Sequence, residues 1–140
     1  MPKLDAGGLQ RFFADEGLDG EGSFVVEDVG EKMACVRLRA APRNLRPGGT
    51  ISGASMMALA DLAIYAALLG EIGLVPLAVT TSLTINFLRK PPLADVLAQA
   101  RLLKVGKTLA FGEIVLVSEG DPRPVAHCTS TYSIPPRAPA

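Results

Sequence analysis

A single aspartate inside an apolar stretch is the first candidate for chemistry in this chain. Asp61 lies within residues 56–69, where the only other polar group is the hydroxyl of Tyr65. Because an ionised carboxylate buried without partners is costly, proteins rarely keep one in such a setting without a use. Just upstream, residues 48–53 combine glycines with hydroxyl side chains where a helix would begin. A carboxylate in a buried helix and a glycine amide at a helix start can act as base and oxyanion donor, which indicates acyl-transfer chemistry.

The composition sets limits on the elements that position these groups. A chain of 140 residues is long enough for one domain with a real core, so we expect a single domain over residues 1–140. Apolar residues make up 49% and charged residues 20%, which argues against extensive disorder. The 14 basic and 14 acidic residues cancel, so no overall field favours nucleic acid or an anionic membrane. We therefore expect neither as a partner.

Cysteine and histidine usage narrows the class further. Cys35 and Cys128 suit a reduced compartment, as packed thiols rather than a disulfide. His127 is the only histidine and lacks clustered ligands, so we expect no metal site and no cofactor. Residues 1–8 have no apolar core of signal-peptide type, and the stretch around Asp61 is shorter than the ~20 residues of a membrane span. These features predict a cytoplasmic protein.

Turn residues divide the chain into elements. Residues 9–13 belong to a short amphipathic helix in an N-terminal segment, 1–20, and residues 135–140 form a loose tail. Alternating or β-branched stretches predict strands at 23–27, 32–39, 79–88, 95–104, 108–117 and 124–134.

One long apolar helix is expected between the second and third of these strands. Ser52 or Ser55 could cap it, and Gly70 or Gly73 could end it. It is apolar on nearly every face, so it should be covered all round.

The order of elements predicts an α+β fold, an antiparallel sheet wrapped around one long central apolar helix. The strands at 32–39 and 79–88 would line the helix, and short turns indicate an antiparallel meander after it. One subunit of this kind leaves a sheet edge or a helix flank open, so a dimer is expected.

Three stretches carry a resemblance to a known family. They are GTISGASMMALAD (49–61), AVTTSLTINFLRKP (78–91) and ARLLKVGK (100–107). Through them the chain resembles the hotdog-fold thioesterases, specifically the PaaI-like acyl-CoA thioesterases of phenylacetate degradation, over residues 23–134. The resemblance implies a hotdog fold and hydrolysis of an acyl-CoA thioester.

The resemblance also implies roles for individual residues. The family's His-Gly-Gly loop is followed, nine residues after the His, by an acidic residue on the helix. Gly53 and Asp61 match this pattern, whereas Ser52 stands at the His position and Ala54 at the second Gly. Asp61 would then be the base or the nucleophile, and the Gly53 amide would polarise the thioester carbonyl. The alternative is that Asp61 binds a neighbouring loop and Gly53 only permits a tight turn; His127 matches no catalytic position.

The spacing between these two residues predicts a shared site. Gly53 and Asp61 are eight residues apart, about 12 Å along one helix. A base or its water must lie within about 3 Å of the carbon that the amide activates. We therefore expect Asp61 of one subunit to meet Gly53 of its partner across a two-fold axis.

Further residues are candidates for substrate contact. By the resemblance, Thr80 holds the attacking water with Thr81 beside it, although threonine is also simply a good strand residue. Met57 could line an acyl pocket or pack in the core. Ser52 and Asn44 are the loop candidates, and for Asn44 we favour a role in shaping the loop.

Four cations are candidates for the phosphates of coenzyme A, because three or four positive charges suit a 3′-phosphate and a pyrophosphate. They lie at one strand exit and one hairpin, where we expect them to cluster: Arg89, Lys90, Lys104 and Lys107. The alternative is ordinary surface charge.

Two other functions remain compatible with the sequence. A hotdog hydratase or dehydratase would need a His with an acidic partner, which Ser52 disfavours. A non-catalytic acyl-CoA binding or sensing module fits the missing His better. For the thioesterase we expect acyl-CoA as substrate, and a homodimer or a tetramer of two dimers as the assembly.

Overall fold

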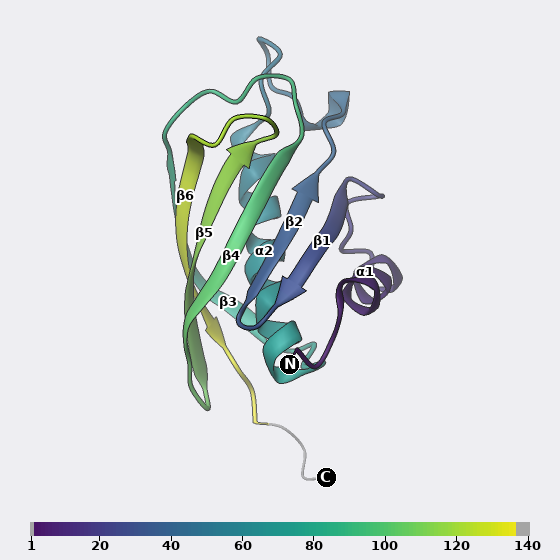
Figure 1. Cartoon of the computed structure of the whole chain (residues 1–140), viewed down its shortest axis with the longest axis vertical. Coiled ribbons are helices and arrows are strands. Elements are labelled where there is room, and N and C mark those ends of the chain that lie inside the picture. The colour runs from purple at the N-terminus through teal and green to yellow at the C-terminus, as the bar shows by residue number, and fades with distance from the viewer. Residues whose placement is uncertain (1, 137–140) are drawn as a thin grey trace.

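The computed structural model describes residues 2–136 and contains one central helix, a curved sheet and an N-terminal helix (Figure 1). The elements in chain order are α1 (Ala6–Asp15), β1 (Phe24–Gly30), β2 (Met33–Leu38), the 3-10 turn η1 (Pro42–Asn44), α2 (Gly53–Ile72), β3 (Val79–Phe87), β4 (Val96–Val105), β5 (Leu109–Ser118) and β6 (Pro124–Ser133). Residues 137–140 of the expected loose tail lie outside the described residues.

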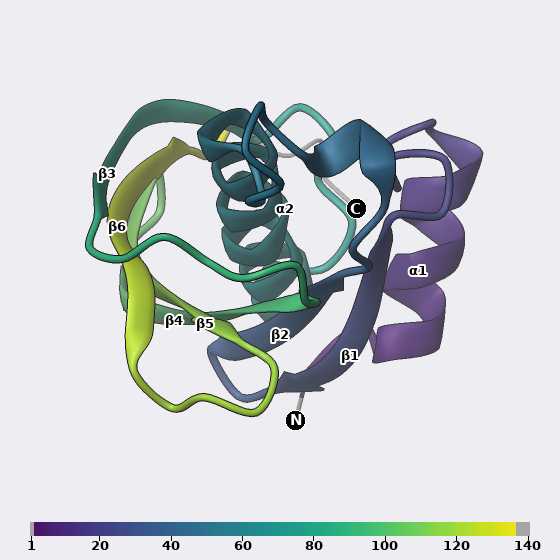
Figure 2. The same ribbon diagram turned by 90° about the horizontal axis from the view of Figure 1, so that it is seen from above.

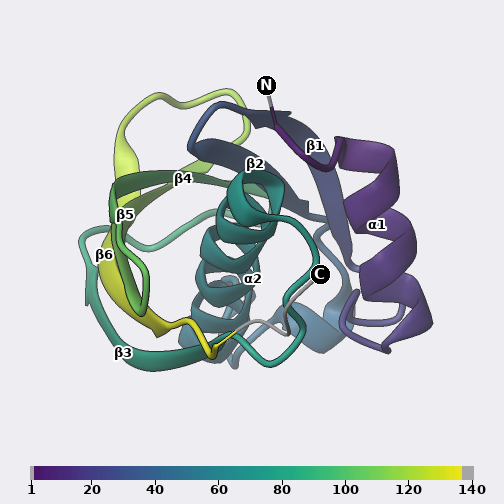
Figure 3. The ribbon, with the colours of Figure 1, turned by 90° about the horizontal axis from the view of Figure 1, so that it is seen from below.

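The six strands form one antiparallel sheet that curves around α2. Their order across the sheet is β1-β2-β4-β5-β6-β3. Figures 2 and 3 view the molecule from its two ends, and in both the sheet wraps one side of α2 while α1 lies beyond β1. The predicted arrangement of an antiparallel sheet around one apolar helix is confirmed.

The position of β3 differs from the prediction. The meander holds for β4, β5 and β6, but β3 pairs with β6 at the far edge of the sheet instead of with β4. The helix packs mainly on β2 and β4, so the strand predicted at 79–88 does not line it centrally. Residues 88–95, which include two prolines, cross the end of the sheet to reach β4, and turn signals alone cannot reveal such a crossover.

Small residues let the helix approach the sheet closely. Gly112 of β5 is the clearest case, because an added Cβ would lie 2.6 Å from Cδ1 of Ile64 on α2 and 2.5 Å from the Arg101 carbonyl. On β2, every second residue is fully buried against the helix side, namely Ala34, Val36 and Leu38. The core is therefore a tight layer of alanines and branched residues between one helix and one sheet.

Helix α2 begins and ends at residues that the sequence indicated, but other elements do not cover it on all sides as expected. Ser52 caps the helix by accepting a hydrogen bond from the Ser55 amide, and Gly73, with a φ of 90°, ends it. The prediction that α2 is covered all round is wrong in its first half, where Ala54, Met57 and Ala58 form one exposed stripe that leads to Asp61. This open side is left by the chain's own sheet, which curves around the other flank.

By length and composition alone, α2 could cross a membrane, with a mean hydropathy of 1.5. However, 67% of its apolar window is buried inside this chain, as in the core helix of a soluble protein.

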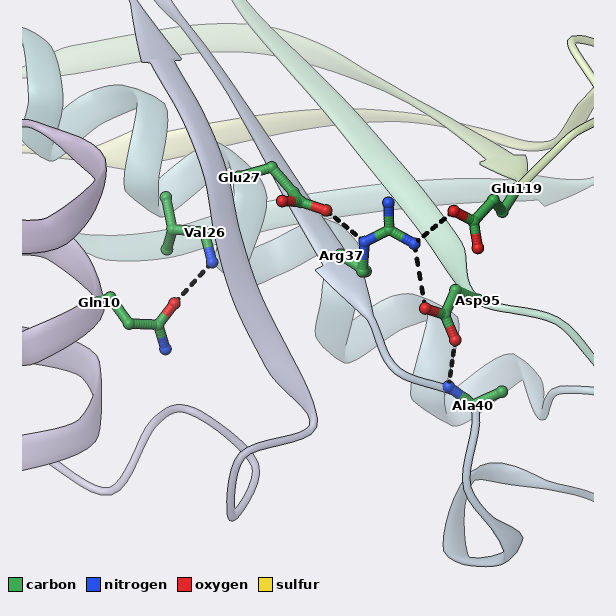
Figure 4. A network of polar contacts seen from close by, with 7 residues as sticks. All are labelled: Gln10, Val26, Glu27, Arg37, Ala40, Asp95 and Glu119. Atoms are coloured by element: carbon green, nitrogen blue, oxygen red, sulfur yellow. Dashed lines mark hydrogen bonds and ion pairs between the residues drawn. The ribbon is translucent and has the colours of Figure 1, made fainter.

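The two edge strands of the sheet, β1 and β3, differ in whether other residues of the chain cover them. The edge at β1 is covered by α1, whose Leu9 and Phe13 are fully buried. The side-chain amide of Gln10 completes this edge as a neighbouring strand would. Its Oε1 accepts from the Val26 amide at 2.6 Å (Figure 4), and its Nε2 donates to the Phe24 carbonyl at 3.2 Å. The edge at β3 has no such cover among the described residues. An open edge of this kind favours pairing with another strand.

An arginine cluster fixes the outer face where β2 leaves the sheet. Arg37 binds the carboxylates of Glu27, Asp95 (3.0 Å) and Glu119 (3.0 Å) (Figure 4). Asp95 also accepts from the Ala40 amide at 2.8 Å. This backbone bond, helped by Arg37, holds the pKa of Asp95 below its ordinary value. The cluster thereby anchors the start of the loop that leads to α2.

Candidate active site

Asp61 is held by two hydroxyl groups, both on the same carboxylate oxygen. Its Oδ1 accepts from Oγ1 of Thr80 at 2.6 Å and from the Tyr132 hydroxyl at 3.1 Å. Among the described residues, none hydrogen-bonds Oδ2. The carboxylate therefore has one fixed oxygen and one oxygen left for a reactant.

A bulge in β3 aims Thr80 at the carboxylate. The pairing of β3 with β6 matches Thr80 to Tyr132 and Ser82 to Thr131, which leaves Thr81 as an extra residue. The bulge puts Thr80 on the inner face with Leu83, whereas unbroken alternation would turn it outward. Thr81 instead lies on the exposed side and donates to the Thr131 carbonyl at 3.2 Å.

An apolar pocket of about 420 Å³ adjoins the carboxylate. Its walls come from α2, the α2–β3 connection, β3, β6, the start of β1 and the segment after α1. The lining residues are Leu18, Phe24, Ala58, Asp61, Leu62, Tyr65, Pro76, Ala78, Val79, Thr80 and Tyr132. Asp61 is the only charged member of this lining. The pocket suits an apolar group attached to a polar reacting centre at Asp61.

Aromatic rings support the back of the pocket. Tyr132 stacks on Tyr65 with ring centroids 5.8 Å apart, and Tyr65 stacks on Phe13 of α1 at 5.9 Å. Burial, followed by the negative charge of Asp61, raises the pKa of Tyr132, and burial also raises the pKa of Tyr65. Both phenols therefore stay protonated at neutral pH, and the Tyr132 hydroxyl is available as a donor.

Gly53 lies at a different hollow, at the other end of β3. This second hollow, of about 410 Å³, is lined by Arg46, Thr50, Ile51, Gly53, Met56, Phe87, Leu88, Arg89, Lys90 and Pro91. The Gly53 amide has no hydrogen-bond partner among the described residues, as the first amide of a helix should. An added Cβ at Gly53 would lie 3.1 Å from the ring of Phe87, so close packing is a second reason for glycine here.

The structure separates Asp61 and Gly53 within one chain, as their spacing predicts. Thr80, which holds Asp61, is near the start of β3, while Phe87, which covers Gly53, ends the same strand. The two residues line different hollows.

The four predicted phosphate-binding cations do not form one cluster in a single chain. Arg89 and Lys90 line the hollow at Gly53, where Arg46 joins them. Lys104 and Lys107 lie at the β4–β5 hairpin, at the opposite end of the sheet. The sequence could not show this separation, because β3 pairs with β6 and not with β4.

Ser52 and Asn44 shape the start of α2. The Ser52 hydroxyl accepts from the Ser55 amide at 3.1 Å and donates to Oγ of Ser55 at 2.9 Å. Asn44 is buried, and its main-chain carbonyl accepts from the Ser52 amide at 2.7 Å. It lines a separate small hollow near Ser23, which fits the favoured role in shaping the loop.

The remaining candidates lie outside both hollows. Met57 is 43% exposed on the open face of α2, beside the pocket at Asp61 but not in its lining. His127 faces away from α2 and pairs with Glu113 at 3.2 Å. Within residues 2–136, no cluster of three His, Cys, Asp or Glu side chains is placed to hold a metal ion.

The sequence prediction did not include Tyr132, Phe87 or Arg46, which lie in the two hollows. Tyr132 could have been found from alternation in β6, since it shares the inward face with Cys128 and Ser130, and a buried phenol needs a partner. Phe87 and Arg46 carry no such signal, because they reach the Gly53 hollow only through the tertiary fold.

Comparisons with known proteins identify the family of the chain. Residues 48–125 match the family described as the thioesterase superfamily, while a search of curated proteins gives no match. A provisionally assigned thioesterase from Silicibacter sp. TM1040 is 46% identical, with a TM-score of 0.90 over 97% of this chain and 95% of that chain.

Two phenylacetic acid degradation proteins also have similar structures. A variant of PaaI from Thermus thermophilus is 25% identical, with a TM-score of 0.73 over 84% of this chain and 98% of that chain. The PaaI protein from E. coli is 22% identical, with a TM-score of 0.75 over 89% and 92% of the two chains, and shows likeness of fold alone. The chain belongs to the thioesterase superfamily and has its hotdog fold.

Proposed function

We propose that the protein is an acyl-CoA thioesterase that hydrolyses a thioester to a free acid and coenzyme A. The observation that carries this proposal is the carboxylate of Asp61, fixed through Oδ1 at the edge of an apolar pocket with Oδ2 left unpaired by any described residue. An acyl chain in the pocket would bring its carbonyl carbon next to this oxygen.

The geometry fits two routes for the same reaction. As a base, Asp61 takes a proton from water while the water oxygen attacks the carbonyl carbon; the C–S bond then breaks and the thiolate of CoA takes up the proton. As a nucleophile, the carboxylate forms a mixed anhydride and expels the thiolate, and water then hydrolyses the anhydride. Both routes place negative charge on the carbonyl oxygen, which needs a hydrogen-bond donor.

The donor that we propose is the Gly53 amide of a second copy of the chain. The open edge of β3 supports this, because antiparallel pairing of two β3 strands about Leu83 would set Val79 of one copy opposite the partner's Phe87. Such pairing would bring the Asp61 pocket of one subunit to the Gly53 hollow of the other. Each dimer would then hold two equivalent sites.

Exposed apolar side chains along this edge support a second copy as the occupant. Leu77, Val79, Phe87 and Leu88 are between 49% and 77% exposed, and Met57 of α2 lies on the same open side. The opposite edge is closed by α1 and Gln10, so it does not compete for pairing.

The same pairing would gather the separated cations. Arg89 and Lys90 of one subunit lie at the Gly53 end of β3, while Lys104 and Lys107 lie at the Asp61 end. Antiparallel pairing would place these two groups together, where they could bind the phosphates of coenzyme A. The proposed site is complete in a dimer. A tetramer of two such dimers would contain the same site without contributing further residues to it.

The test is hydrolysis of a panel of short, long and aromatic acyl-CoAs by the wild type and by Asp61→Asn, which keeps an acceptor for Thr80 and Tyr132. We expect the variant to lose about 10²- to 10⁴-fold in kcat. Glu71→Gln, on the same helix but bound to the Lys32 amide, should retain wild-type rates. Unchanged hydrolysis in both Asp61→Asn and Asp61→Ala would overturn the proposal.

A non-catalytic acyl-CoA binding module is the second candidate. It is favoured by Ser52, which stands at the family's His position and whose hydroxyl is engaged in capping α2. Such a protein would be stabilised against heat by acyl-CoA without turning it over. A hydratase or dehydratase is less favoured, because His127, the chain's single histidine, lies on the outer face with Glu113.

A further inference from the structure

The phenol of Tyr132 belongs to the pocket lining and is buried against Asp61. The side chain is 4% exposed, its ring stacks on Tyr65, and its hydroxyl lies 3.1 Å from Oδ1 and 3.4 Å from the main-chain carbonyl of Asp61. A hydroxyl in this place reaches both the side chain and the backbone of one helical residue. It therefore restricts the rotation of the carboxylate relative to its own helix.

Thr80 and Tyr132 approach the carboxylate from two different strands. Thr80 comes from the edge strand β3 and Tyr132 from its neighbour β6, and the two residues are paired across the ladder. Two donors on one oxygen can both be satisfied only if Oδ1 points toward the sheet. In that orientation Oδ2 is turned away from both donors.

We propose that Tyr132 is a positioning residue, which acts with Thr80 to hold Asp61 so that Oδ2 is the oxygen presented to the reactant. This inference rests on the proposed function only for the identity of the reaction.

The hydroxyl can be removed without removing the ring. Tyr132→Phe keeps the stack on Tyr65 and leaves Thr80 in place. We expect kcat to fall about 10-fold with KM changed less than about twofold, because the change removes a hydrogen bond to the carboxylate and keeps the aromatic ring in the pocket lining.

Ser130→Ala is the matched control. Ser130 is buried on the same inward face of β6, and the variant loses one hydroxyl hydrogen bond, to the Ser82 carbonyl (3.0 Å), away from the carboxylate. This control should leave both kcat and KM unchanged.

A second measurement keeps the two proposals apart. In ¹³C-labelled protein at one fixed pH, the chemical shift of the Asp61 carboxyl signal should change in Tyr132→Phe, which loses the phenol hydrogen bond, and stay in place in Ser130→Ala, whether or not any thioester is hydrolysed. If the wild type hydrolyses acyl-CoA but the kcat and the carboxyl signal of Tyr132→Phe match the wild type, the positioning role is wrong and the thioesterase proposal stands. If the signal moves in a protein that hydrolyses nothing, the positioning role stands and the proposed function fails.

Discussion

At the scale of single residues, the Gly53 amide can be tested because its position tolerates proline. Gly53 is the first residue of α2, where proline fits the helix and its missing N–H breaks no internal bond. The preceding Ser52 is extended (φ −71°, ψ 151°), as a residue before proline prefers. Gly53→Pro therefore removes the amide donor while leaving the helix able to form.

We expect Gly53→Pro to lower kcat by about 10²- to 10³-fold, the usual loss for one oxyanion donor. Gly53→Ala is its matched control, since it adds a Cβ against Phe87 as proline does but keeps the N–H. Hydrolysis rates and thermal melts of both variants check the prediction. Equal losses in the two variants would mean that crowding at Phe87, and not the amide, is responsible.

At the scale of elements, the cluster around Arg37 of β2 ties together four neighbouring strands, because its three carboxylates lie in β1, just before β4 and just after β5. Its side chain is 22% exposed and the Asp95 side chain 28%, so the pair is partly shielded from solvent. Arg37→Met keeps the apolar stem but leaves three carboxylates close together without their cation. We expect a loss of about 1–2 kcal/mol in the free energy of unfolding at pH 7, measured by urea denaturation. Arg123→Met, which removes an exposed bond to Asp121, should leave the urea midpoint nearly unchanged.

The pH dependence of this loss follows from Asp95. Its pKa is lower in the folded protein than the ordinary 3.8, so its contribution to stability is present above that value and is lost as the pH falls through the folded pKa. The difference between Arg37→Met and the wild type should therefore shrink below about pH 4. A difference that stays constant down to about pH 2 would show that Arg37 stabilises by packing alone.

Elements also show where sequence reasoning reaches its limit. Burial at Ala34, Val36 and Leu38, and the capping by Ser52, are local properties of a strand and a helix end, so periodicity and side-chain chemistry predict them. The pairing of β3 with β6 is not local, because it depends on a crossover whose direction no turn residue specifies. The motif is also local, so it could single out Asp61 and Gly53 as candidates. It could not show that Tyr132 lies beside Asp61 or that Lys104 is far from Arg89, because both depend on the strand pairing.

At the scale of the whole molecule, the proposed site requires two chains, and this requirement can be tested by complementation. Asp61→Asn and Gly53→Pro should each be inactive as a homodimer, because each lacks one component in both sites. In a mixed dimer, one site would combine the intact Asp61 of the Gly53→Pro chain with the intact Gly53 of the Asp61→Asn chain. The other site would carry both changes and stay inactive.

Random mixing of equal amounts produces mixed dimers in half of the population, each with one working site of two. Co-expressed or co-refolded chains should therefore recover about a quarter of wild-type activity, and mixed dimers isolated with two different tags about half. Sedimentation of each sample establishes that dimers have formed. A site contained within one chain predicts no recovery at any mixing ratio, since neither variant chain holds both groups, and would require a different oxyanion donor for Asp61.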